Sequence, residues 1–134
     1  PRFGEYEHEH TKAWSSIVKG SDAFVFVTPE YNYSPPPALL NAIDYLSQEW
    51  AYKPAGLVSY GGISGGMRAA QMLKQTLGAV KVVPIPDSVT ITFFPQLMEN
   101  HVFKGSEALE KSSVTMLDEL SRWTDAMRAL RSEK

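Results

Sequence analysis

The stretch Asp22-Ala-Phe-Val-Phe-Val-Thr-Pro-Glu-Tyr-Asn-Tyr-Ser-Pro-Pro-Pro-Ala-Leu-Leu-Asn-Ala-Ile-Asp-Tyr-Leu46 predicts a strand, a loop and a helix in succession. Residues 23–27 are apolar without alternation, which is typical of a strand covered on both faces in a parallel sheet. Ser34 and Pro35 have the residue types of a helix cap and first turn, so we expect a helix from there to about residue 48. The loop that opens at Pro29 therefore follows the carboxyl end of a buried strand, where open α/β sheets bind ligands.

Helices and strands alternate along the rest of the chain, which predicts an α/β fold with a parallel sheet. The expected elements are a helix that ends near Gly20, strands at 23–28, 55–60 and 80–85, a helix at 66–77 that ends before Gly78, and a final helix capped by Ser106. Pro84 and Pro86 favour an edge position for the third strand. We expect residues 87–105, which carry Phe93, Phe94, Met98 and Phe103, to be irregular and packed over the domain or a neighbouring subunit.

Composition limits the protein to one domain. The sequence has 134 residues, 43% of them apolar, and a net charge of −2 with the two signs interspersed. A binding surface for nucleic acid or for anionic membranes is therefore not indicated, and a small molecule is the expected partner. Cysteine is absent, which excludes disulfides and thiolate sites and fits a cytoplasmic location. No bilayer-spanning stretch or signal-like segment is evident.

The first visible strand is also the most apolar, and such a strand at an open sheet edge would promote aggregation. We therefore expect either another subunit or, in preference, one or two earlier strands to pair with it. On this interpretation the domain, residues 1–134, is incomplete at its N-terminal side, and the loop that usually holds phosphate is missing with those strands.

The loop after the first strand is the first candidate site. It consists of Pro29, Glu30, Tyr31, Asn32 and Tyr33. One interpretation is a turn that merely connects strand and helix. The alternative is a ligand site, because Tyr31 and Tyr33 place two amphipathic rings beside free backbone N–H groups, which suits a flat heteroaromatic ligand.

The second candidate is the glycine-rich segment that follows the next strand. It runs Ser59, Tyr60, Gly61, Gly62, Ile63, Ser64, Gly65, Gly66 and matches neither a Walker loop nor the dinucleotide fingerprint. It is either a tight strand-to-helix turn or a place where absent side chains let the backbone approach a ring. Because both loops are expected at the same edge of the sheet, together they are stronger evidence for a ligand site than either loop alone.

Other chemistry has little support. His8 and His10 are two residues apart, so on a helix their rings would diverge, and we predict no metal site. Glu30 is the single carboxylate of the presumed site, which does not favour paired-carboxylate hydrolysis. Ser59 and Ser64 lack the G-x-S-x-G context of a catalytic nucleophile.

These segments resemble the NAD(P)H-dependent FMN reductase family of the flavodoxin-like fold: Thr28-Pro-Glu-Tyr-Asn, Ser34-Pro-Pro-Pro-Ala-Leu-Leu-Asn-Ala-Ile-Asp-Tyr-Leu, Lys53-Pro and Ser59-Tyr-Gly-Gly-Ile-Ser-Gly-Gly66. The similarity covers about residues 10–90. It implies FMN as cofactor, NADPH or NADH as hydride donor, and a flavin, quinone, azo compound or metal oxyanion as acceptor. It implies no dedicated catalytic side chain, because hydride passes directly from nicotinamide to flavin.

The resemblance also implies roles for the two loops. The backbone of 30–32 is expected beside flavin N5 and O4, and the N–H groups of Gly61 and Gly62 beside N1 and O2. Arg68 would meet a cofactor phosphate, meet another subunit or simply be a solvated charge. The nearly all-apolar 35–48 helix predicts a homodimer or homotetramer interface. The alternative function is a flavodoxin-like electron carrier or redox-sensing protein without its own turnover, although a net charge of −2 is low for a carrier.

Overall fold

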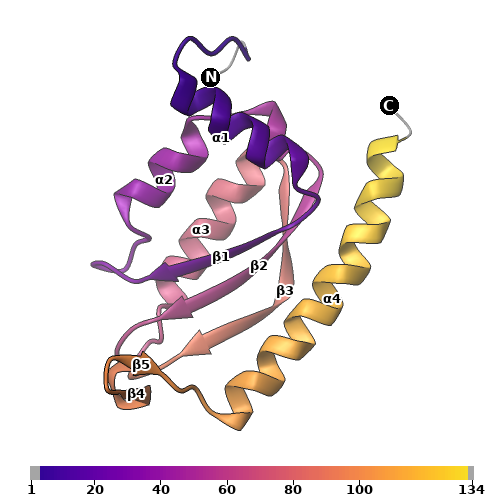
Figure 1. Ribbon diagram of the computed structural model, residues 1–134. Helices are drawn as coiled ribbons and strands as arrows, with labels where there is room; N and C mark the ends of the chain where they lie inside the picture. Colours follow the sequence, from indigo (N-terminus) through magenta and orange to yellow (C-terminus); the bar gives the residue numbers. More distant parts are fainter. Residues whose placement is uncertain (1–3, 133–134) are drawn as a thin grey trace.

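The computed structural model describes residues 4–132 and shows a parallel three-stranded sheet between two layers of helices (Figure 1). The elements are α1 (Glu9–Gly20), β1 (Phe24–Pro29), α2 (Pro37–Asp44), the 3₁₀ turn η1 (Gln48–Trp50), β2 (Lys53–Tyr60), α3 (Met67–Ala79), β3 (Val82–Ile91), the 3₁₀ turn η2 (Phe94–Leu97), the short hairpin β4 (Met98–Glu99) and β5 (Val102–Phe103), and α4 (Glu107–Ser132). The predicted α/β class is confirmed, and β3 lies at an edge in the order β1-β2-β3, as its prolines indicated. Within the described residues, no helix is long and apolar enough to cross a membrane.

The strand register brings the carboxyl ends of all three strands into one row. Pro29 pairs with Tyr60, and Tyr60 pairs with Ile91. Because these residues end β1, β2 and β3, the loops that follow leave the same edge of the sheet. The expected meeting of the first two loops is therefore confirmed, and a third loop joins them.

The two faces of the sheet carry separate hydrophobic cores. The helices α1, α2 and α3 lie on one face of the sheet (Figure 1). The core on this face contains Phe24, Phe26 and Leu57 around the fully buried Trp50. On the other face, Met116 and Leu120 of α4 pack on β2 and β3. Along β2 neighbouring side chains alternate between these cores, with Leu57 in the first and Val58 in the second, as the period of two in a β-strand requires.

The helix α2 begins later than the sequence suggested. Ser34 does not cap it: its hydroxyl donates to the carbonyl of Pro35, and Pro36, in an extended conformation, occupies the cap position. A residue that precedes proline is disfavoured in the α region, so neither Pro35 nor Pro36 can be helical and Pro37 is the first residue that can. The helix ends at Asp44 instead of near residue 48.

The expected bounds of three other elements, β2, α3 and β3, were wrong. Lys53 and Pro54 belong to β2, and Gly78 lies inside α3, while Gly66 stands before that helix as its cap. The third strand extends to Ile91, beyond the predicted end at residue 85. A register shift opposite Ala55 and Leu57 accommodates the proline-containing part of β3, because a bulge leaves a residue out of the hydrogen-bond ladder.

One face of β1 is open, contrary to the expectation of a strand covered on both faces. Val25 and Val27 are 43% and 61% exposed, because α4 packs on β2 and β3 instead of β1. Among residues 4–132, no strand pairs with the outer edge of β1.

The large apolar residues of 87–105 are more exposed than they would be if this segment packed over the domain. Phe93, Phe94, Met98 and Phe103 remain 36–47% exposed instead of packing over the domain. Ser106 caps α4 as predicted, because its hydroxyl oxygen accepts a hydrogen bond from the N–H of Leu109 at 3.3 Å. The buried face of α4 is formed by Met116 and Leu120, whereas Val114, Leu117 and Leu130 of the same helix are exposed.

Candidate functional site

A cavity of about 500 Å³ opens where the three loops meet at the carboxyl edge of the sheet. Its volume lies in the range of small-molecule and cofactor sites. The loop after β1 supplies Pro29, Glu30 and Tyr31, the turn after β2 supplies Tyr60, Gly61 and Gly62, and the segment after β3 supplies Phe93, Phe94 and Pro95.

The tyrosine loop, which follows β1 and carries Tyr31 and Tyr33, is a tight turn closed by its own backbone. The N–H of Tyr31 donates to the carbonyl of Ser34 at 2.9 Å, and the N–H of Ser34 donates back to Tyr31 at 3.0 Å. Asn32 and Tyr33, the two residues between them, both have positive φ. Asparagine tolerates this conformation well and tyrosine poorly, so the turn is strained at Tyr33. The rings of Tyr31 and Tyr33 are left exposed.

The glycine turn, residues 61–66 between β2 and α3, is packed tightly on one side and open on the other. A Cβ on Gly66, which has a φ of +79°, would lie 2.8 Å from the backbone N and O of Tyr60. A Cβ on Gly65 would lie 2.5 Å from the methyl group of Thr90. A Cβ on Gly62 would meet no atom within 4 Å. Gly65 and Gly66 therefore permit close packing, whereas Gly62 presents bare backbone to the cavity.

The third loop is tied to the glycine turn by the backbone. Gly61 donates its N–H to the carbonyl of Ile91 at 3.1 Å, and the N–H of Phe93 donates to the carbonyl of Gly62 at 3.1 Å. The expectation that Gly61 offers its N–H to a ligand was therefore wrong, because this donor is already used. Within the described chain the N–H of Gly62 donates to no protein group, so it remains available.

Glu30 joins the tyrosine loop to α3. Its carboxylate accepts hydrogen bonds from the backbone N–H of Arg68 at 3.0 Å, the Ser64 hydroxyl at 3.1 Å and the Arg68 guanidinium at 3.2 Å, with a longer one from the N–H of Ala69 at 3.4 Å. Burial alone would raise the pKa of Glu30, but the bonds from Arg68, Ser64 and the two backbone N–H groups outweigh it and hold that pKa below its ordinary value. Glu30 is therefore ionised at neutral pH.

Arg68 is a partner of the site's own residues and not a free surface charge. Its guanidinium lies 4.4 Å from the centre of the Tyr33 ring while it pairs with Glu30. The cation and the ring attract each other, so Arg68 also holds Tyr33 in place.

The structure gathers most of the predicted site residues around the cavity and leaves four outside. Asn32 and Tyr33 lie at the tip of their turn, while Ser59 of β2 and Gly65 of the glycine turn are buried. The prediction missed Phe93, Phe94 and Pro95. The ring of Phe94 meets that of Tyr60 edge to face, with 5.3 Å between ring centres. The signal that could have found this wall was the apolar Phe93-Phe94-Pro95 directly after the third strand.

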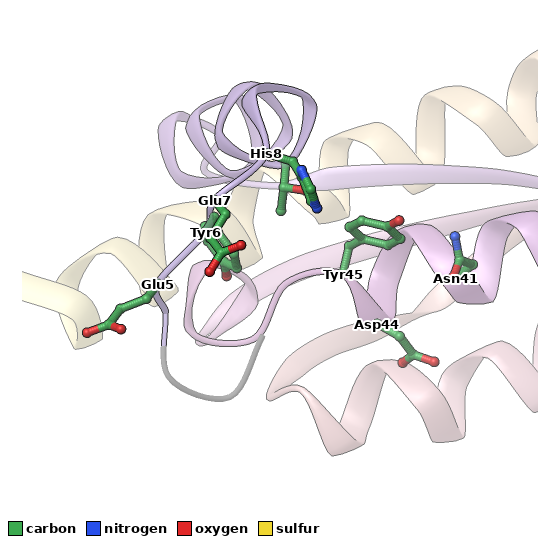
Figure 2. A pocket seen from close by; sticks show the side chains of 8 residues that line it. Glu5, Tyr6, Glu7, His8, Asn41, Asp44 and Tyr45 are labelled. Carbon is green, nitrogen blue, oxygen red and sulfur yellow. The ribbon is translucent and has the colours of Figure 1, made fainter.

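A second cavity, of about 410 Å³, lies between the segment before α1 and the end of α2 (Figure 2). The rings of His8 and His10 stack there at 5.4 Å, and His10 meets Tyr45 edge-on. The prediction that the two histidines diverge was wrong, because His8 precedes the helix in an extended conformation. Among residues 4–132, no cluster of His, Cys, Asp and Glu side chains could hold a metal ion.

Comparison with known proteins agrees with the loop geometry. The sequence profile described as NADPH-dependent FMN reductase matches residues 2–96. The chain belongs to this family. An NAD(P)H-dependent FMN reductase of Schizosaccharomyces pombe is 49% identical over 87 residues, which cover 65% of this chain and 43% of that protein. An NAD(P)H-dependent FMN reductase of Saccharomyces cerevisiae is 49% identical over 78 residues, which cover 58% of this chain and 40% of that protein. The matched segments thus span less than half the length of these relatives.

The fold agrees with the family assignment and is flavodoxin-like. The flavoenzyme NAD(P)H:(acceptor) oxidoreductase FerB of Paracoccus denitrificans superposes with a TM-score of 0.69 at 24% identity, covering 91% of this chain and 69% of that protein. An oxidoreductase of Corynebacterium diphtheriae superposes with a TM-score of 0.62 at 18% identity, covering 96% of this chain and 65% of that protein.

The cavity fits the flat ring of the cofactor for which the FMN reductase family is named. Tyr31 and Phe94 provide aromatic walls, and the bare backbone at Gly62 permits close approach by a planar group. The free N–H of Gly62 can donate to a ring oxygen or nitrogen. The residues present therefore suit the edge of an isoalloxazine ring.

Proposed function

We propose that this chain forms part of an FMN-dependent oxidoreductase that uses NADPH or NADH to reduce a flavin, a quinone or a similar small acceptor. The observation that carries the proposal is the cavity of about 500 Å³ between the tyrosine loop and the glycine turn at the carboxyl edge of the sheet. Family membership supports it, as do relatives named NADPH:quinone oxidoreductase in rice and NADPH azoreductase in Bacillus. Bound FMN would supply the redox chemistry, the transfer of reducing equivalents from NADPH or NADH to the acceptor.

The protein's own residues would bind, orient and shield the ring. Tyr31 would cover one part of it, while Tyr60 and Phe94 exclude water from the opposite wall. The N–H of Gly62 would donate to the ring edge, which stabilises negative charge there. No acid or base side chain is needed for the transfer itself, because stacking sets the distance between donor and acceptor.

The experiment is reconstitution of the intact protein with FMN, followed by oxidation of NADPH with and without a quinone. We expect the flavin fluorescence to be quenched on binding, and NADPH oxidation to accelerate when the quinone is added. Binding of FMN without turnover would favour an electron carrier instead. Failure to bind FMN at micromolar concentrations would refute the proposal.

Two further properties belong to the same proposal. A homodimer or homotetramer would form through the 35–48 segment, where Tyr45 is 40% exposed and Leu39 and Leu40 are only partly buried. Light scattering that shows a monomer at micromolar concentration would contradict this. A cytoplasmic location is supported by the absence of cysteine.

A further inference from the structure

The helix α3 begins without a cap of its own. Its cap residue is Gly66, which has no side chain, and no capping hydrogen bond comes from that position. The first N–H groups of a helix have no partner inside it, so another group must satisfy them. Here the carboxylate of Glu30, 38 positions before Arg68, accepts from the N–H groups of Arg68 and Ala69.

The position of Glu30 makes this bond more than a helix cap. Glu30 and its chain neighbours Pro29 and Tyr31 line the cavity, and so do Gly61 and Gly62 of the turn that leads into α3. The Glu30 side chain is only 10% exposed, whereas that of its ion-pair partner Arg68 is 51% exposed. A nearly buried carboxylate with these donors is held firmly, since hydrogen bonds to an ionised group are stronger than neutral ones.

We propose that Glu30 is a positioning residue that fastens the tyrosine loop to the first turn of α3 and so fixes the width of the flavin cavity. The inference rests on the proposed function, because it assigns the two walls to one ligand. Glu30 acts through its carboxylate on α3 and not on the ring. The ion pair with Arg68 and the stacking of Arg68 on Tyr33 add to the fastening from the solvent side.

The test compares Glu30→Ala, Glu30→Gln and Arg68→Gln in the intact protein, with Asp118→Asn as control. Asp118 is an exposed carboxylate on α4, away from the cavity lining. Hydrogen exchange at the amides of Arg68 and Ala69 reports the fastening without any flavin. Quenching of FMN fluorescence gives the dissociation constant, and the visible circular dichroism of bound FMN reports the ring's surroundings.

We expect Glu30→Ala to lower amide protection at both positions about tenfold and to raise the FMN dissociation constant about tenfold, as loss of charge-assisted hydrogen bonds implies. Glu30→Gln keeps an acceptor oxygen and should recover part of both effects. Arg68→Gln keeps the backbone bonds and should change binding by less than about threefold. Asp118→Asn should change neither, and the circular dichroism should change in the Glu30 variants alone.

Lost protection with unchanged FMN affinity in Glu30→Ala would overturn the positioning role, and so would unchanged protection. If Glu30→Ala does not fold, Glu30→Gln decides by the same two measurements. If the unaltered protein binds no FMN, the proposed function fails and the positioning role fails with it. Amide exchange needs no flavin, so it would still show whether Glu30 fastens the loop to α3. Failure of the proposed function is therefore seen as absent FMN binding, and failure of the fastening as unchanged amide protection in Glu30→Ala.

Discussion

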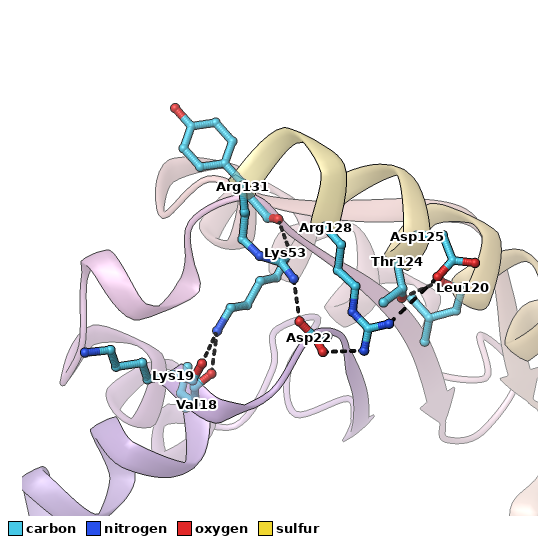
Figure 3. Close-up of polar contacts among 10 residues, drawn as sticks. Val18, Lys19, Asp22, Lys53, Leu120, Thr124, Asp125, Arg128 and Arg131 are labelled. Atoms are coloured by element: carbon cyan, nitrogen blue, oxygen red, sulfur yellow. Dashed lines mark hydrogen bonds and ion pairs between the residues drawn. The ribbon is translucent and has the colours of Figure 1, made fainter. Parts of the chain in front are cut away.

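The guanidinium of Arg128, near the end of α4, donates a 2.6 Å hydrogen bond to the carboxylate of Asp22, which lies 106 residues earlier and just before β1 (Figure 3). Arg131 pairs with the other oxygen of the same carboxylate and also donates to the carbonyl of Tyr52. Close by, the buried Lys53 donates at 2.6 Å to the carbonyl of Val18 at the end of α1. The contacts of Arg128 and Arg131 hold the end of α4 against the amino edge of the sheet, away from the cavity.

Asp22→Asn should lower the melting temperature, because it removes the shared partner of two arginines. Both side chains of the Asp22 and Arg128 pair are partly exposed, so salt should screen the interaction. The difference in melting temperature between Asp22→Asn and the unaltered protein should therefore be smaller at high salt. Thermal unfolding at low and high salt measures this. Asp118→Asn is the control, and an equal loss in that variant would refute a specific role for Asp22.

Acid should remove the contribution of Asp22. Its pKa lies below the ordinary value, chiefly because Arg128 donates a hydrogen bond to the carboxylate. Burial alone would raise this pKa, but the charges of Arg128 and Arg131 lower it further. The contribution is complete above the ordinary pKa of aspartate, about 4, and is lost as the pH falls through the lower pKa of the folded state. The free energies of unfolding in urea of the protein and of Asp22→Asn should therefore differ by a constant amount above about pH 5, and this difference should shrink as the pH falls below about 4 toward the lower pKa of the folded state. A difference that grows on acidification would contradict this pairing.

Trp50 should be among the costliest core residues to replace. It is fully buried, and its ring lies 5.0 Å from that of Phe24 and 5.8 Å from that of Trp14. Its indole N–H donates to the carbonyl of Ile43 at 3.0 Å. We expect Trp50→Ala to lower the free energy of unfolding by about 3–5 kcal/mol and Trp50→Phe by about 2 kcal/mol. Denaturant unfolding measures both. Trp123→Phe, at a partly buried position on the other face, should cost less, and the opposite order would contradict the assignment of the main core.

The sequence was sufficient to predict the order of elements and the meeting of two loops. Apolar runs define the strands, and parallel strands joined by helices must place their carboxyl ends on one edge. The helix starts were less predictable where two local preferences compete. Ser34 has the side chain of a cap, but the prolines after it exclude the helical conformation until Pro37.

The remaining features of the site depend on contacts that local patterns do not contain. Phe93 and Phe94 line the cavity because β3 continues to Ile91, past the predicted end at residue 85. Glu30 reaches α3 only because both loops leave the same edge of the sheet, so its partner, 38 positions away, is invisible in the sequence. A prediction confined to neighbouring residues identified the loops and missed what joins them.

The glycine turn offers a matched pair of substitutions that separates folding from binding. Gly66→Ala combines a φ of +79° with a contact of 2.8 Å to the backbone of Tyr60, so it should lower the free energy of unfolding by about 2 kcal/mol or more. Gly62→Ala meets no protein atom within 4 Å and should leave the free energy of unfolding within about 0.5 kcal/mol.

The new methyl group of Gly62→Ala would occupy space at the cavity wall that a bound ring requires. We therefore expect this variant to fold normally and to bind FMN about tenfold more weakly. Urea unfolding and flavin fluorescence titration measure the two properties on the same samples. If Gly62→Ala bound FMN as tightly as the unaltered protein, the ring would not approach the backbone at this turn, and the assignment of the cavity would be wrong.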